Sequence, residues 1–159
     1  MPRHETQSIR LTPRFRRLQV LRSERLTPNM QRIIVGGPEL EGFDSRSPDD
    51  HVKLFFPNAD GVFVLPELTE QGLRYPEGKQ PSPARDYTPR LYDAAADELT
   101  LDFVLHGDGP ATHWAAAARA GDELVVAGPR GSRVVADDFD AYVLFGDETA
   151  LPAIARRLE

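Results

Sequence analysis

The chain has 159 residues, of which 40% are hydrophobic and 28% charged, with a net charge of −6 and no cysteine. This composition is typical of an ordinary folded domain, and the negative charge argues against general binding to nucleic acid. The lack of cysteine excludes disulfides, thiolate nucleophiles and thiolate metal sites. No apolar run approaches the roughly 20 residues of a membrane span, and the N-terminus lacks the apolar core of a signal peptide, so we expect a cytoplasmic protein without a transmembrane segment.

The first half of the chain alternates short apolar-patterned segments with turn residues. Residues 1–12 are polar, and we expect them to be flexible or disordered. Strands are predicted where side chains alternate between Pro- and Gly-rich breaks, at residues 14–26, 30–35, 51–56 and, more briefly, 62–64. Residues 66–84 are rich in Pro and also hold Gly72 and Gly78, which predicts an irregular surface loop.

Three more strands are predicted, at residues 85–93, 98–106 and 123–127, and one helix begins at Pro110. Several short strands with no helix before residue 110 are typical of an antiparallel β barrel. We therefore predict that residues 13–138 form one barrel domain.

The pattern changes at residue 139. Residues 141–145 form a continuous apolar run, as expected for a strand buried on both faces, and Leu151, Ile154 and Leu158 recur at helical spacing. A parallel strand of this kind needs neighbours reached by crossover connections. We interpret residues 139–159 as the first β-α unit of an α/β nucleotide-binding-type domain that is truncated in this sequence.

The segment Arg85-Asp86-Tyr87-Thr88-Pro89-Arg90 carries the first candidate site. Strand alternation places Arg85 and Tyr87 on one face. A guanidinium and a flat phenol two residues apart suit a ligand with an anionic group at one end and a planar ring at the other. The alternative is an edge strand with an exposed tyrosine and solvated arginines, because short motifs also occur by chance.

A second candidate site follows a strand, at Gly107-Asp108-Gly109-Pro110-Ala111-Thr112. Pro110 fits the first helical position, so the free amides of Ala111 and Thr112 lie at the positive end of the helix dipole. Such a helix start binds phosphate well, although a simple Gly-Pro helix start explains the stretch equally. Together with Arg85, it could hold a pyrophosphate from two sides.

The R-x-Y-T segment followed by G-P-A-T at a helix start resembles the FAD-binding domain of the ferredoxin–NADP reductase superfamily. Within it, five features resemble the siderophore-interacting proteins, a family of flavin-dependent ferric-siderophore reductases. These features are the full R-x-Y-T-x-R, the Asp50–Leu54 strand, the Asp102–Gly107 strand end, Trp114 and the Gly146–Pro152 turn. The resemblance covers about residue 14 to residue 159.

The resemblance implies a role for each matching position. Arg85 would contact the FAD pyrophosphate, Tyr87 would stack on the isoalloxazine ring, and Thr88 would hydrogen-bond near flavin N5. The ribityl and phosphate region would be lined by Val104 and His106, the pyrophosphate cradled by Gly109, Ala111 and Thr112, and a second positive charge supplied by Arg90. We expect no catalytic side chain, since the cofactor does the chemistry, and no metal site.

The implied function is to pass electrons from NAD(P)H, or from reduced ferredoxin, through FAD to the Fe(III) of a ferric siderophore. Release of Fe(II) would then serve iron acquisition. Asp147 and Glu148 would repel an anionic donor, although a capped strand-to-helix turn explains them equally. Two alternatives stay open: a general flavin reductase or oxygenase-reductase component, and a non-enzymatic flavin- or siderophore-binding module.

Overall fold

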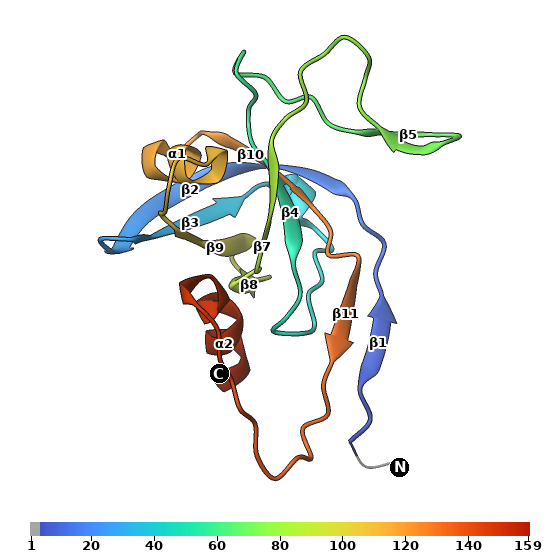
Figure 1. The fold of residues 1–159 in the computed structure, drawn as a ribbon, viewed down its shortest axis with the longest axis vertical. Coiled ribbons are helices and arrows are strands. Elements are labelled where there is room, and N and C mark those ends of the chain that lie inside the picture. The colour runs from blue at the N-terminus through green and yellow to red at the C-terminus, as the bar shows by residue number, and fades with distance from the viewer. Residues whose placement is uncertain (1–3) are drawn as a thin grey trace.

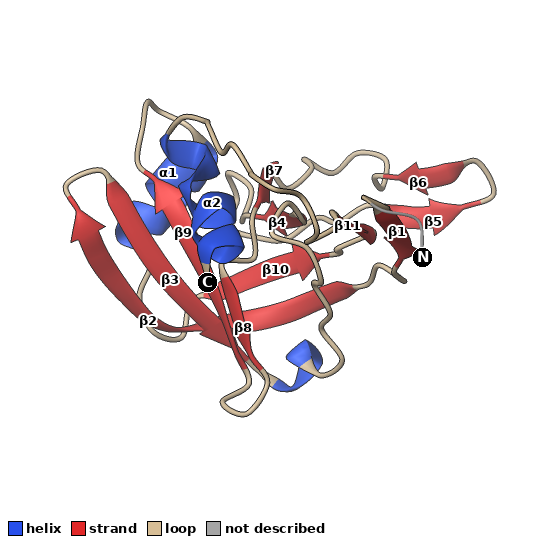
Figure 2. Cartoon of the chain, turned by 90° about the horizontal axis from the view of Figure 1, so that it is seen from below, coloured by secondary structure: helices blue, strands red, loops and turns tan. Residues whose placement is uncertain are grey.

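The centre of the computed structural model, which describes residues 4–159, is a curled seven-stranded antiparallel sheet (Figures 1 and 2). Its strands run in the order β7-β4-β10-β2-β3-β9-β8. They are β2 (Phe15–Thr27), β3 (Met30–Gly36), β4 (Val52–Phe55), β7 (Ala84–Tyr87), β8 (Leu91–Asp93), β9 (Glu98–Val104) and β10 (Glu123–Ala127). The curled antiparallel sheet confirms the predicted antiparallel barrel class.

Two helices lie against this sheet. Helix α1 (Pro110–Ala117) follows β9, as the sequence predicts, and α2 (Leu151–Leu158) follows a single 3-10 turn, η2 (Glu148–Ala150). A further 3-10 turn, η1 (Pro38–Leu40), follows β3. In Figure 1 the link after β11 (Gly131–Val134) swings away from the sheet, and α2 then returns beside β8 and β9.

The core lies on the concave side of the sheet, because alternate residues of its long strands are apolar. Its fully buried members include Leu18, Val20, Ile33, Val35, Leu99, Leu101, Phe103, Leu124 and Val126. Helix α1 closes one end of this core with Ala111 and Ala115, and Trp114 packs against Phe56 and Phe103, as expected for a packing residue. Burying each large apolar side chain stabilises the fold by about 1.5–3 kcal/mol.

The two edges of the sheet meet at the candidate motif. β7 and β8 are consecutive in the chain but lie at opposite ends of the strand order. Only Thr88, Pro89 and Arg90 join them, and the four steps from Tyr87 to Leu91 span about 14 Å at most. The sheet must therefore curl until its edges approach one another. The prediction of a single strand over residues 85–93 is wrong, because the chain passes from one edge of the sheet to the other at Pro89, which has no N–H to donate to a ladder.

Two small ribbons were not expected from the sequence. β1 (Gln7–Arg10), predicted to be flexible, pairs with β11, and the exposed hairpin β5 (Glu67–Thr69) and β6 (Gly72–Arg74) extends away from the sheet in Figure 1. Residues 62–64, predicted as a strand, form none. The flexibility expected of residues 1–3 lies outside the described residues.

The predicted strand at residues 141–145 is also absent. Val143 and Phe145 are 84% and 89% exposed, and no described segment pairs with them. The reason is that a parallel strand is stable only beside neighbours that complete its ladder. The helix that was expected after this run is present as α2, and its Arg156 donates two hydrogen bonds to Ser45.

Candidate functional site

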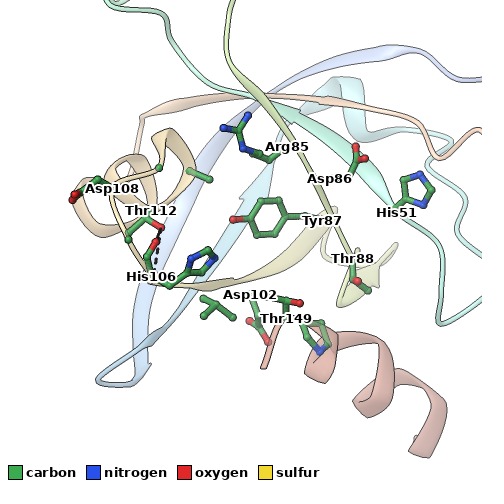
Figure 3. A pocket seen from close by; sticks show the side chains of 15 residues that line it. His51, Arg85, Asp86, Tyr87, Thr88, Asp102, His106, Asp108, Thr112 and Thr149 are labelled. Atoms are coloured by element: carbon green, nitrogen blue, oxygen red, sulfur yellow. Dashed lines mark hydrogen bonds between the residues drawn. The ribbon is translucent and has the colours of Figure 1, made fainter. Parts of the chain in front are cut away.

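The main candidate site is a cavity of about 570 Å³ between β7, the end of β9, the start of α1 and the η2–α2 turn (Figure 3). This volume is within the usual range for small-molecule and cofactor sites. Eight of the nine residues predicted from the sequence line it. They are Arg85, Tyr87, Thr88, Val104, His106, Gly109, Ala111 and Thr112.

Strand β7 supplies the ring and one positive charge. Arg85 and Tyr87 lie opposite Leu54 and Val52 of β4, so they share a face and both point toward α1 in Figure 3. Asp86 points to the other side and pairs with Lys53 at 2.7 Å. Arg85 has no salt bridge to any described residue, and its Nη1 donates only to the neighbouring carbonyl of Ala84. Its charge is therefore available to an anionic ligand.

The Tyr87 ring is supported by a contact with the core. Its ring packs on Phe103 of the core, with the centroids 4.4 Å apart. Burial raises the pKa of Tyr87 to about 12, an effect that the nearby Arg85 charge partly offsets. The side chain is therefore a neutral phenol at physiological pH, and a flat ring can lie on it.

The start of α1 supplies hydrogen-bond donors. Gly109 is the N-cap in an extended conformation and makes no side-chain cap, so the helix itself does not use the amides of Ala111 and Thr112. The Thr112 hydroxyl donates to the His106 carbonyl at 3.0 Å and so ties the helix start to the end of β9. The backbone of Gly107 has a φ of +60°, which favours glycine at this tight turn.

Arg90 is the one predicted site residue outside this cavity. Its guanidinium forms two hydrogen bonds with the Glu159 carboxylate, at 2.6 and 2.9 Å, and its backbone amide donates to Thr100. Arg90 therefore joins the motif to the end of α2. The break at Pro89 moves it away from Arg85, and its role in cofactor binding stays a prediction.

The cavity also has lining residues that the sequence did not reveal, among them Asp102 and Thr149. Asp102 is held by Arg32, which donates from Nε and Nη2 at 2.7 and 2.8 Å. A signal for Asp102 exists in the sequence, since it alternates with the core residues Leu101 and Phe103 and must face away from them.

The turn before α2 is capped, as one of the two readings of the sequence expects. Asp147 accepts hydrogen bonds from the hydroxyl and the amide of Thr149, and these bonds hold the pKa of Asp147 below its usual value. Gly146 is required in this turn, because a Cβ at this position would lie 2.4 Å from the Cβ of Ala150. Thr149 and Pro152 thereby reach the cavity wall.

These features fit FAD. The unused amides of α1 and the free guanidinium of Arg85 suit a pyrophosphate, and the backed ring of Tyr87 suits a flat heterocycle. Among the described residues, no group of three metal-ligating side chains comes together. No helix in the same part of the chain is long and apolar enough to cross a membrane.

The curled antiparallel sheet, with the start of a helix whose free amides suit phosphate beside a strand that carries an aromatic ring, is the arrangement of an FAD-binding domain. The chain belongs to the siderophore-interacting FAD-binding domain family, whose model matches residues 19–133.

Proteins with similar sequences or structures have names that agree with this family. The NADPH-dependent ferric-chelate reductase of Escherichia coli (strain K12) is 52% identical over 153 residues, which is 96% of this chain and 59% of that protein. The ferric vibriobactin reductase ViuB of Vibrio cholerae is 38% identical over 94% of this chain and 55% of its own length. The crystal structure of a siderophore utilization protein from T. fusca has a TM-score of 0.79 and 41% identity, over 98% of this chain and 59% of that one. This chain thus spans less than two thirds of each.

Proposed function

We propose that this chain forms the flavin-binding part of a reductase that passes electrons from NAD(P)H, or from reduced ferredoxin, through FAD to the Fe(III) of a ferric siderophore. The observation that carries the proposal is that Arg85, Tyr87 and the start of α1 line one cavity. The relatives named for NADPH-dependent ferric-chelate reduction and for ferric vibriobactin reduction support the choice of donor and substrate.

Bound FAD would supply the electron-transfer chemistry. The chain's own residues bind and orient the cofactor. Arg85 and the amides of Ala111 and Thr112 would hold the pyrophosphate, and the Gly109 turn would let the backbone approach it. Tyr87 would cover one face of the ring and exclude water from it, and Thr88 would hydrogen-bond near N5. Val104 and His106 would line the ribityl region.

The rest of the reaction follows from the ligand chemistry. Fe(III) binds the hard oxygen ligands of a siderophore far more tightly than Fe(II) does, so reduction frees the metal for use in the cell. This role places the protein in the cytoplasm. We also propose that residues 13–138 are the FAD-binding domain, and that residues 139–159 would form the first β-α unit of a C-terminal α/β domain when neighbouring strands are present.

A titration tests the proposal. The purified protein is mixed with FAD, FMN and riboflavin, and binding is followed by flavin fluorescence. We expect FAD to bind most tightly and to lose its fluorescence. The protein loaded with FAD is then mixed anaerobically with NADPH, NADH or reduced ferredoxin, followed by a ferric siderophore and a coloured Fe(II) chelator.

Bleaching by one donor and a stoichiometric Fe(II) signal are the expected results. Absence of FAD binding would overturn the proposal. If bound FAD is bleached by dithionite but by none of the three donors, a flavin-binding module is the better description. Reduction of free flavins, without Fe(II) release from the siderophore, points to a general flavin reductase.

A further inference from the structure

Three acidic side chains line the cavity, those of Asp86, Asp102 and Asp108, and FAD binding does not explain the most buried of them, Asp102. It lies on β9 beside Thr88 and Thr149 in Figure 3, and it is only 9% exposed. Its neighbours Leu101 and Phe103 belong to the core, so the carboxylate lies on the opposite side of the strand, at the cavity wall. An isolated buried charge is costly, and such groups are kept only when paired.

The partner of Asp102 is Arg32. The two residues lie directly opposite one another on β9 and β3, and their side chains form a bidentate ion pair. The two side chains lie at different distances from the cavity. The Asp102 side chain is 8% exposed and borders the cavity, whereas the Arg32 side chain is 29% exposed and does not line it. The negative end is therefore the end nearer a bound ligand.

Stability alone does not account for this pair. Replacing a buried ion pair by apolar residues of similar volume is often neutral or stabilising. Two ordinary apolar residues at these positions would continue the sheet without placing a charge beside the cavity. We therefore look for the role of the Asp102 charge in its effect on a ligand bound in the cavity.

We propose that the Asp102–Arg32 pair sets the reduction potential of the flavin held in this cavity, with the Asp102 carboxylate lowering it. The inference rests on the proposed FAD site. Reduction by hydride transfers two electrons and one proton from the donor to the ring, so the ring gains one negative charge and the donor loses one. A fixed carboxylate in the wall opposes that change, and Arg32, which is farther away, cancels only part of its effect.

Other charges act on the same site. Arg85, His106 and Asp108 also line the cavity, and Glu148 shares a second, adjoining cavity with Asp102. Among the acids here, Asp102 is distinguished by its burial. Asp108 is fully exposed, and Asp86 is half exposed and paired with Lys53, so solvent screens both of those charges. A lower potential makes the reduced cofactor a stronger donor, which suits an acceptor whose Fe(III) is stabilised by its chelator.

The test is the Asp102→Asn substitution, which keeps the shape of the side chain and removes its charge. We expect the equilibrium for two-electron reduction of bound FAD to shift at least tenfold toward the reduced form, which raises the potential by about 30 mV. By linkage, the ratio of the dissociation constants for oxidised and reduced FAD must change by the same factor. Both quantities are measured without any turnover of substrate.

Glu98→Gln is the matched control. Glu98 is on the same strand and forms a bidentate pair with Arg22, at 2.7 Å for both bonds, but it does not line the cavity. This variant should change the reduction equilibrium less than twofold. A shift of equal size in both variants, or none in Asp102→Asn, would overturn the inference.

A second variant, Arg32→Gln, should change the reduction potential in the opposite direction. Loss of the guanidinium leaves the carboxylate uncompensated, so the potential should fall when it is measured at alkaline pH, where the unpaired carboxylate stays ionised. If Asp102→Asn does not fold or bind FAD, the direction found in Arg32→Gln decides, and a rise or no change refutes the inference. If the unaltered protein itself binds no FAD, the proposed function fails first, so the two failures are distinguishable.

Discussion

The ring of Tyr87 lies against the fully buried ring of Phe103, with centroids 4.4 Å apart and planes tilted by 39°. Phe103 in turn packs on Trp114 of α1, at 5.8 Å. The candidate flavin-stacking residue therefore rests on the core of the barrel, through side chains from two different elements. This backing fixes the plane on which a ligand ring can lie.

Tyr87→Ala should weaken FAD binding and restore part of the flavin fluorescence that the stacked ring quenches. Aromatic pairs contribute about 0.5–1.5 kcal/mol beyond their buried area, so a loss of roughly threefold to tenfold or more in affinity is expected. Tyr87→Phe is the control and should keep both affinity and quenching. The measurement is a fluorescence titration; unchanged quenching in the alanine variant would remove Tyr87 from the site.

Alkaline pH should destabilise the protein through Tyr87. Its pKa is about 12 in the folded chain because of burial, against about 10 in an unfolded one. As pH rises between these values, the unfolded chain has already lost the proton that the folded chain retains, so the free energy of unfolding falls. Below about pH 10 this residue contributes no pH dependence.

Urea unfolding of the unaltered protein and of Tyr87→Phe, at about pH 9 and again at about pH 11, checks this prediction. The unaltered protein should lose more of its stability than the variant does. Comparing the two variants cancels the titration of the other tyrosines and of the lysines. An identical loss in both would mean that the Tyr87 phenol is not held in its neutral form.

Arg85→Ala should weaken binding of FAD about tenfold or more, because a hydrogen bond to a charged group contributes roughly 1.5–3 kcal/mol. Riboflavin has no pyrophosphate, so its affinity should not change. Arg74→Ala is the matched control, since it removes the same charge from the exposed β6 strand, away from the cavity. Titrations with both ligands compare the two variants with the unaltered protein, and an equal loss for FAD and riboflavin in Arg85→Ala would place the pyrophosphate elsewhere.

Phe145→Ser should reduce self-association of the 159-residue chain at almost no cost in stability. Its side chain is 89% exposed, and exposed apolar clusters promote association. Substitutions at such surface positions usually change stability by no more than about 0.5 kcal/mol. Phe139→Ser is a useful contrast, because Phe139 stacks on His4 and contacts Tyr142.

Sedimentation velocity and thermal unfolding measure the two effects separately. The expected result is a more monomeric Phe145→Ser protein with an unchanged melting temperature, and a lower melting temperature for Phe139→Ser. Unchanged association in Phe145→Ser would show that the exposed run does not mediate contacts between chains.

Sequence reasoning reached those site features that depend on local geometry. Arg85 and Tyr87 share a face because side chains alternate along a strand, and the free amides of Ala111 follow from a proline at the first turn of a helix. Both arguments need only a few neighbouring residues, and the structure brings the two segments to one cavity, as the family resemblance implies.

The features that sequence reasoning missed depend on contacts between distant residues. The pairing of Arg90 with Glu159 joins residues 69 positions apart, and strand β1 is ordered only by β11, more than a hundred residues later. The pairing of Asp102 with Arg32 depends on the β3–β9 register, which sets the two residues opposite one another. Local preferences carry no information about such partners, since tertiary packing decides them.

The join at Thr88, Pro89 and Arg90 has a consequence for how the domain tolerates change. Because these three residues are the whole connection between the two edges of the sheet, their number limits the circumference of the barrel. An insertion between Tyr87 and Leu91 would let the edges of the sheet move apart. The exposed β5–β6 hairpin, in contrast, can change length without affecting the circumference of the barrel. The segment that carries Arg85 and Tyr87 is thus also the segment whose length sets the width of the barrel, so cofactor contacts and barrel dimensions cannot vary independently.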